Sequence, residues 1–367
     1  DAGKLGYGLK VGNGTRLYLA YSTIHHNNGV GIAFEIGSDI TEFKSNKLFD
    51  NTTSAMRIPA QVMAKVFWDS EISGNPIQIT EGKILSGTNS SWPSFSVGYE
   101  MDEDLVIYNS STFFMGAGTK LSMGTDKAIR VIAGSAIRID GDALAPVIIE
   151  GKSKTKGSWR GLYIENSQAK QSIIDHAQIN FTGSNAIAGQ APASIKLGNG
   201  ASLKLSNTTL DQGKGIGLEA VASNLKLEMV NNLIQNHLSY PISVSAQMVE
   251  QLDYLTRFEN NTVNEVAVDG FHALAKDGGE IVWKGFAQMV PFVIKGLGKD
   301  LLIQSGMRIK AGVIIKMQNG SRIDVRVANG RLGYLNIEGI QGRPVIIEGV
   351  NDTPGSWYGI TYSTNHA

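Results

Sequence analysis

Five residues near the beginning of the chain have side chains suited to acid–base chemistry. His25 and His26 are adjacent, and Asp69 and Glu71 stand two positions apart. Residues two apart on a strand point to the same side, so Asp69 and Glu71 can form a carboxylate pair, with Asp50 one coil away. Adjacent histidines point to opposite sides of a strand and share a surface only in a turn. These five are the candidate catalytic residues, and a carboxylate pair among them would act on a glycosidic bond.

The densest acidic run is a candidate metal site. It consists of Asp102, Glu103 and Asp104. Clustered carboxylates are calcium ligands, although the turn-forming Asn109-Ser110-Ser111 that follows makes a solvated loop the simpler interpretation. We therefore expect no cofactor, with calcium reserved for the case in which the protein is a lyase. The chain has no cysteine, which excludes disulfides, thiolate metal sites and cysteine nucleophiles.

Two tryptophans occur in the same short pattern, Gly-Ser-Trp-x-Gly. They are Trp159 and Trp357, and Tyr163, Tyr358 and Tyr362 are close to them in the sequence. Exposed aromatic rings can lie against sugar rings, so these five are the candidate carbohydrate-binding residues. The alternative is structural, because the glycines permit a tight bend and each indole can pack against the adjoining Pro-Val-Ile-Ile strand.

These residues must be positioned by a framework that is written twice. The segment Lys10–Leu17 returns as Lys196–Leu203 at an offset of 186 residues, and 139–163 matches 337–361 at 13 of 25 positions. A long internal repeat is the sequence signature of a solenoid. We expect one continuous β-helix over 1–367, with an internal duplication of approximately 1–186 (copy one) and 187–367 (copy two).

Short apolar runs with a period of two predict strands that have one buried face. Examples are Ile32–Ile36 and Leu203–Leu205, and clusters of Gly, Asn, Asp and Ser separate such runs. Short helix patterns occur only at 59–66 and 245–254, which are equivalent places in the two copies. Asparagine-rich steps such as 45–51 predict a ladder in which corner side chains bond the coils above and below.

Together these features resemble right-handed parallel β-helix proteins of the pectate-lyase-like type. The repeated Pro-Val-Ile-Ile-Glu-Gly, followed by Gly-Ser-Trp, is similar to an element of exported bacterial surface β-helix proteins. The resemblance implies an all-β right-handed solenoid of about 15 coils, roughly 70 Å long at ~4.8 Å per coil. It also implies that any catalysis acts on a polysaccharide in a groove. Of the sequence elements shared by polygalacturonase-type hydrolases, only Arg308-Ile309-Lys310 is present, and we interpret it as a chance match.

Composition limits the partners. The 33 basic and 33 acidic residues give a net charge of zero, which argues against a nucleic-acid partner. No apolar run is long enough to span a membrane. We expect a monomer that is extracellular or on a bacterial cell surface, secreted or lipid-anchored through an N-terminal segment that is not part of this sequence.

The leading functional hypothesis is a protein without a catalytic set. It would bind glycans or other partners along an exposed face, or act as an extended scaffold. The alternative is a polysaccharide lyase or glycoside hydrolase with a groove site in one copy only. A third hypothesis, an adhesion fibre, predicts a trimer. Because charged residues differ most between the copies, any activity should lie where the copies disagree.

Overall fold

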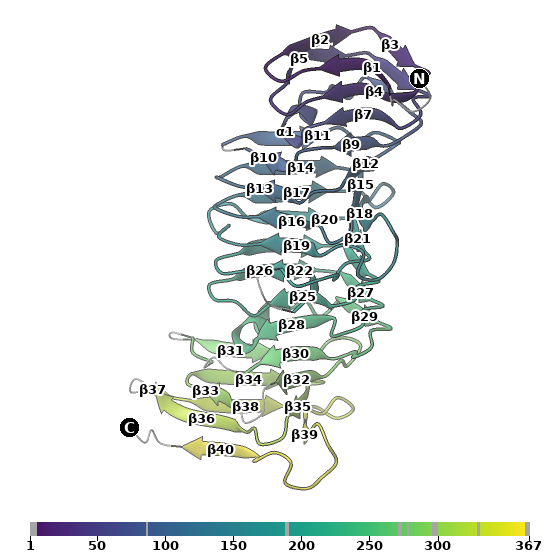
Figure 1. The fold of residues 1–367 in the computed structure, drawn as a ribbon. Coiled ribbons are helices and arrows are strands. Elements are labelled where there is room, and N and C mark those ends of the chain that lie inside the picture. The colour runs from purple at the N-terminus through teal and green to yellow at the C-terminus, as the bar shows by residue number, and fades with distance from the viewer. Residues whose placement is uncertain are drawn as a thin grey trace.

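The computed structural model describes residues 6–85, 87–187, 191–270, 274–276, 279–295, 300–328 and 331–363. The chain forms a parallel β-solenoid of about 13 turns, with 48% strand and 3% helix. Figure 1 shows a rod in which successive coils stack from the N-terminal to the C-terminal end. The prediction of an all-β solenoid is confirmed. The number of coils is below the expected value because corner loops such as 152–160 lengthen several coils.

Each complete coil supplies three strands, one to each face of the rod, and nearly all ladders are parallel. Face one contains β1 Gly6–Val11, β4 Gly29–Phe34, β7 Ser54–Ile58, β9 Ile77–Ile79, β12 Tyr99–Met101, β15 Lys120–Met123, β18 Val147–Gly151, β21 Ala177–Asn180, β24 Thr209–Asp211, β27 Leu233–Gln235 and β29 Arg257–Glu259. Face two contains β2 Arg16–Ala20, β5 Asp39–Lys44, β10 Lys83–Ile84, β13 Leu105–Ile107, β16 Ala128–Val131, β19 Gly161–Ile164, β22 Ala193–Leu197, β25 Ile216–Ala220, β28 Ile242–Ser245, β30 Val266–Asp269, β32 Phe292–Lys295, β35 Ile314–Met317 and β39 Ile346–Gly349.

Face three contains β3 Thr23–His25, β6 Lys47–Phe49, β8 Glu71–Ile72, β11 Asn89–Trp92, β14 Thr112–Gly116, β17 Ala136–Asp140, β20 Ser172–Asp175, β23 Ser202–Ser206 and β26 Lys226–Val230. Two further sheets complete the C-terminal coils: β31 Glu280–Trp283 with β34 Gly306–Lys310 and β38 Tyr334–Glu338, and β33 Leu301–Ile303 with β36 Ile323–Ala328 and β40 Ile360–Ser363. Strand β37 Arg331–Leu332 pairs antiparallel with β36.

The core is a single apolar column along the axis of the rod. On face one, Ile77, Tyr99, Leu121, Ile149 and Ile179 are successive partners in the ladder. Each is buried, and each contributes on the order of 2 kcal/mol by leaving water. Alternation with period two therefore places one row of each strand inside and the next row outside.

Asparagines at the corners hold successive coils together, as predicted, mainly through the backbone. Asn46 accepts a hydrogen bond from the Ser22 N–H (3.0 Å) and donates one to the Leu19 carbonyl (3.0 Å). Its equivalent Asn232 accepts from the Thr208 N–H (3.1 Å) and donates to the Leu205 carbonyl (2.9 Å). The same side chain therefore satisfies backbone groups that would be unpaired where the chain turns.

The second copy is rotated by one face relative to the first. Strand β1 lies on face one, whereas its sequence equivalent β22 lies on face two. The chain from β1 to β21 contains 21 strands and one helix, which is one element more than seven coils of three. Equivalent residues of the two copies therefore point in different directions.

One short helix replaces a strand in each copy, at the positions predicted. Helix α1 Ala60–Met63 lies between β5 and β10, and η1 Ala246–Gln251 lies beside β26. Trp92 packs beneath the first helix and donates its indole N–H to the Ala60 carbonyl at 3.0 Å. Its counterpart Trp283 is equally buried, but its indole N–H has no hydrogen-bond partner among the described residues.

This pair of tryptophans gives a matched stability test. Trp92→Phe removes a buried hydrogen bond, whereas Trp283→Phe removes an unsatisfied donor, so the first should cost about 1 kcal/mol more of the free energy of unfolding. Denaturant titration of both variants measures the difference. Equal losses of stability would contradict the difference in hydrogen bonding between Trp92 and Trp283.

Candidate functional site

The two candidate histidines lie in a turn, which is the arrangement that lets them share a surface. His25 ends β3, and His26 has a left-handed backbone with φ of 54°. Their Nδ1 atoms are 2.5 Å apart, and the ring of His25 stacks on Phe49 with centroids separated by 4.8 Å. Both imidazoles are exposed, so the pair forms a surface corner.

The three candidate carboxylates have separate partners. Asp50 lies 3.8 Å from His26 Nε2, and Glu71 forms an ion pair with Lys47 at 3.0 Å. Asp69 accepts hydrogen bonds from the backbone N–H of Ser45 (2.9 Å) and from its hydroxyl (2.8 Å), and these bonds lower the pKa of Asp69. These contacts link successive coils and give no evidence for a carboxylate pair.

The acidic run at 102–104 is likewise tied into local contacts. Asp102 bonds Lys152 at 3.1 Å, and Asp104 accepts the Ala128 N–H at 3.0 Å. Over the ranges that the structure describes, no group of three or more His, Cys, Asp or Glu side chains could hold a metal ion. The calcium hypothesis therefore gains no support from this geometry.

Glu103 and Asp104 do line a cleft of about 430 Å³ with Asp126 and Arg160. Arg160 binds Asp126 through two nitrogens, at 3.1 and 2.8 Å. Ser184 and Asn185 also donate hydrogen bonds to Asp126. These bonds, chiefly from Arg160, hold the pKa of Asp126 well below its usual range. The carboxylate is thus an ionised anchor for the loop 181–187.

Two of the candidate aromatic residues are not available to a ligand. Trp159 is fully buried and donates its indole N–H to the Asn180 carbonyl at 2.8 Å. Tyr163 is also buried, and burial together with Glu165 raises its pKa to about 12. Trp159 packs within the main apolar core, and Ile187 packs against Tyr163, so neither ring presents a face to a sugar. Trp357 is half-buried, whereas Tyr358 and Tyr362 are exposed.

A buried serine–histidine pair was not foreseen from the sequence. Ser194 Oγ is 2.9 Å from His237 Nε2, and His237 Nδ1 is 2.8 Å from the Gln235 carbonyl, so Nδ1 donates and Nε2 accepts. Both residues are buried, and Thr182 closes the cluster by bonding Ser194. His237 stands at the position equivalent to Asn51, a ladder asparagine, and that substitution was the sequence signal. The pair has the contacts of a nucleophile and base but no opening to solvent.

A buried ion pair lies on the same covered strand. Ile195 and Leu197 of β22 belong to the core, so Ser194 and Lys196 point outward. Lys196 Nζ nevertheless lies buried, 3.3 Å from Glu219 on β25. Burial lowers the pKa of Lys196 and raises that of Glu219. The outer face of β22 is therefore a closed polar layer.

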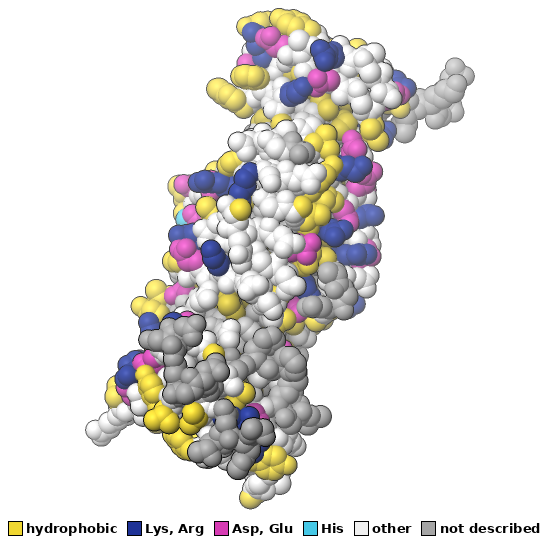
Figure 2. Space-filling model, turned by 90° about the vertical axis from the view of Figure 1, so that its left-hand side faces the viewer, with side chains coloured by type: hydrophobic (Ala, Val, Ile, Leu, Met, Phe, Trp, Pro, Cys, Tyr) yellow, Lys and Arg dark blue, Asp and Glu magenta, His cyan; other side chains and the backbone are white. Residues whose placement is uncertain are grey.

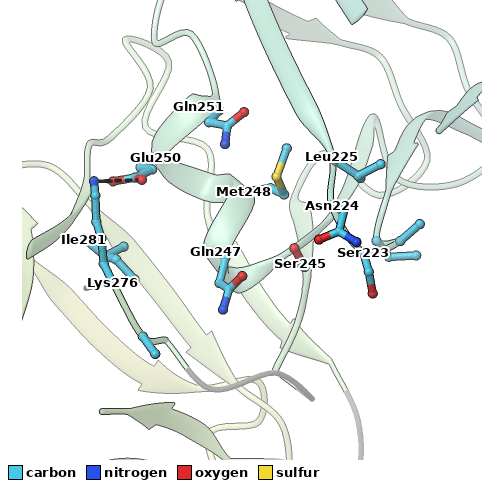
Figure 3. Close-up of a pocket in the computed structure, with 13 residues that line it drawn as sticks. Ser223, Asn224, Leu225, Ser245, Gln247, Met248, Glu250, Gln251, Lys276 and Ile281 are labelled. Atoms are coloured by element: carbon cyan, nitrogen blue, oxygen red, sulfur yellow. Dashed lines mark hydrogen bonds and ion pairs between the residues drawn. The ribbon is translucent and has the colours of Figure 1, made fainter. Parts of the chain in front are cut away.

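An open recess lies where η1 interrupts the sheet of face three. Its volume is about 340 Å³. Figure 3 shows η1 running between the turn residues Ser223 and Asn224 on one side and the Glu250–Lys276 pair on the other. Leu225, Met248 and Ile281 supply apolar surface, and Ser245, Gln247 and Gln251 supply hydroxyl and amide groups. Gln251 also accepts the Leu227 N–H at 3.0 Å, in place of the missing strand.

The described lining of the recess carries no net charge. Among these described residues the charged ones are Glu250 and Lys276, which pair with each other at 3.0 Å. In copy one the positions equivalent to Leu225 and Gln251 are Asp39 and Lys65, which form an ion pair at 2.5 Å beside α1. At these two positions the framework thus carries an ion pair in copy one and the uncharged Leu225 and Gln251 in copy two.

No protein-family model, curated protein or solved structure shows a significant match to the chain. None of the helices within the described ranges is long and apolar enough to cross a membrane. Of the features that the resemblance implies, the structure shows the parallel β-solenoid. The pectate-lyase-like type and the bacterial source remain predictions.

The buried histidine predicts a pH dependence of stability. Burial lowers the pKa of His237 to about 4 in the folded protein, against about 6.5 in an unfolded chain. Between these values the unfolded chain binds more protons. The stability that neutral His237 contributes to the fold is therefore fully present above pH ~6.5. It is lost on acidification, by about 3 kcal/mol at pH ~4. His237→Asn, which restores the ladder residue, should flatten the pH profile of the denaturation midpoint. Parallel profiles would contradict this assignment.

Proposed function

We propose that the protein is a non-enzymatic carbohydrate-binding scaffold, exported to the extracellular space or a bacterial surface, and that the recess beside η1 takes a neutral sugar. The recess is the observation that carries this proposal. Its volume of about 340 Å³ is at the lower end of the range for small-molecule sites, which suits a mono- or disaccharide.

The chemistry of the lining favours an uncharged, polyhydroxylated ligand. Asn224, Gln247 and Ser223 can exchange hydrogen bonds with hydroxyl groups, and Met248 and Ile281 offer apolar contact to C–H surfaces. A carboxylated sugar would need an unpaired cation to compensate its desolvation, and Lys276 is already paired with Glu250.

The absence of a catalytic role is supported by the site residues themselves. The candidate carboxylates of copy one bond histidine, lysine and serine side chains of neighbouring coils. Glycoside hydrolysis requires two carboxyl groups that face one another across the scissile bond. Their contacts with neighbouring coils favour a role in coil stacking.

Calorimetric titration tests the proposal. The probes are glucose, galactose, mannose, N-acetylglucosamine, their disaccharides and, for comparison, the galacturonate trisaccharide. At least one neutral sugar should bind, and more tightly than the galacturonate. Binding of galacturonate alone, or of no sugar, would overturn the proposal, and release of reducing ends from polysaccharide would overturn its non-enzymatic part.

The duplication supplies a matched pair of variants. Gln247→Ala should weaken binding of the neutral sugar roughly three- to tenfold by removing hydrogen bonds to the ligand. Gln61→Ala, at the equivalent position beside α1, should leave the affinity unchanged. Equal effects of the two substitutions would place the ligand elsewhere.

A further inference from the structure

Four aromatic side chains are exposed at the N-terminal end of the rod. Tyr18 is 63% exposed, Tyr21 77%, Phe67 56% and Trp68 77%. Figure 2 shows hydrophobic side chains interleaved with basic and acidic ones at this end. Aromatic rings usually bury most of their surface, so such exposure marks an interaction surface.

The four rings lie on two coils, Tyr18 and Tyr21 on the first and Phe67 and Trp68 on the third, with Lys44 on the coil between them. Tyr18 stands opposite Glu42 in the β2–β5 ladder, and the Tyr21 N–H donates to the Lys44 carbonyl at 3.2 Å. Lys44 Nζ lies 5.9 Å from the centre of the Tyr21 ring. One coil further, the Phe67 N–H donates to the Phe43 carbonyl at 3.1 Å, and Trp68 is the next residue.

The coil framework does not require aromatic rings at these positions. At the offset of 186 residues, Tyr18 and Tyr21 correspond to Lys204 and Asn207 in copy two. Lys204 takes its place in the ladders of β23, and Asn207 follows that strand. At the same offset Phe67 corresponds to Asp253, whereas Trp68 corresponds to another aromatic residue, Tyr254. Three of the four rings therefore occupy positions where the coil framework accepts a polar residue.

We propose that Tyr18, Tyr21, Phe67 and Trp68 form a platform that binds a flat, neutral polysaccharide. This extends the proposed carbohydrate binding to a second surface and rests on different residues. Exposed aromatic rings spaced along stacked coils suit a polymer whose sugars expose C–H faces, as β-1,4-linked glucans do. Tyr21 and Trp68 are about two coil steps apart, on the order of 10 Å, which is roughly the length of a disaccharide.

Charge on the platform favours a neutral ligand over a membrane or a polyanion. Lys44 pairs with Glu42 at 2.6 Å, and Lys65 pairs with Asp39 at 2.5 Å. Anionic lipid surfaces attract uncompensated basic residues. Here the basic side chains that surround the aromatic rings are matched by carboxylates.

Co-sedimentation with insoluble β-1,4-glucan tests the platform. The double variant Tyr21→Ser, Trp68→Ser should lower retention at least tenfold. Its calorimetric affinity for the neutral sugar of the recess and its thermal stability should not change, because both side chains are exposed. Tyr254→Ser, which removes an aromatic ring that is 51% exposed in copy two, is the control and should bind normally.

The outcomes separate the two proposals. Retention that persists in the double variant, or a wild-type protein that binds anionic phosphatidylserine vesicles and no glucan, would overturn the platform. Loss of sugar binding in Gln247→Ala with intact glucan retention bears only on the recess. Loss of glucan retention with intact sugar binding supports the platform independently.

Discussion

The parallel hydrogen bonds between successive coils are the interaction on which the rest of the structure depends. Each coil satisfies its backbone groups only by pairing with the coils above and below, so every corner must recur at nearly the same place. This explains why asparagines such as Asn46 and Asn232 bond backbone atoms of the preceding coil rather than one another. It also explains why a side chain that departs from the pattern, as His237 does, must find a complete set of new partners.

The duplication bears on function because equivalent strands of the two copies lie on different faces of the rod. One additional strand, β21, turns copy two by one face, so α1 and η1 interrupt different faces of the rod. A continuous groove cannot then display equivalent residues of both copies. Each copy has been left to carry its own surface chemistry, with aromatic rings around Lys44 in one and a neutral hollow beside Met248 in the other.

Interruptions of the sheets, more than the sheets themselves, create places for a ligand. A regular face of the solenoid is a flat array of side chains, whereas a helix that replaces a strand leaves a hollow and unpaired edge groups. Gln251 satisfies one of these edge groups by accepting a hydrogen bond from the Leu227 N–H. The space that remains beside the helix is the recess. Beside α1 in copy one, the equivalent positions carry Lys65 and Asp39, which form an ion pair.

The sequence by itself determined the solenoid, its doubled framework, the corner asparagines and the two short helices, because these follow from local periodicity and turn chemistry. It also identified Trp159 and Tyr163 but could not tell packing from ligand binding. That depended on tertiary contacts, because Trp159 lies within the axial core and Ile187 packs against Tyr163. The recess and the Ser194–His237 pair were likewise decided only by tertiary structure. The physical reason is that neighbours across coils are set by the number of strands and the length of each corner loop, and a single added strand changes the face on which every later residue lies.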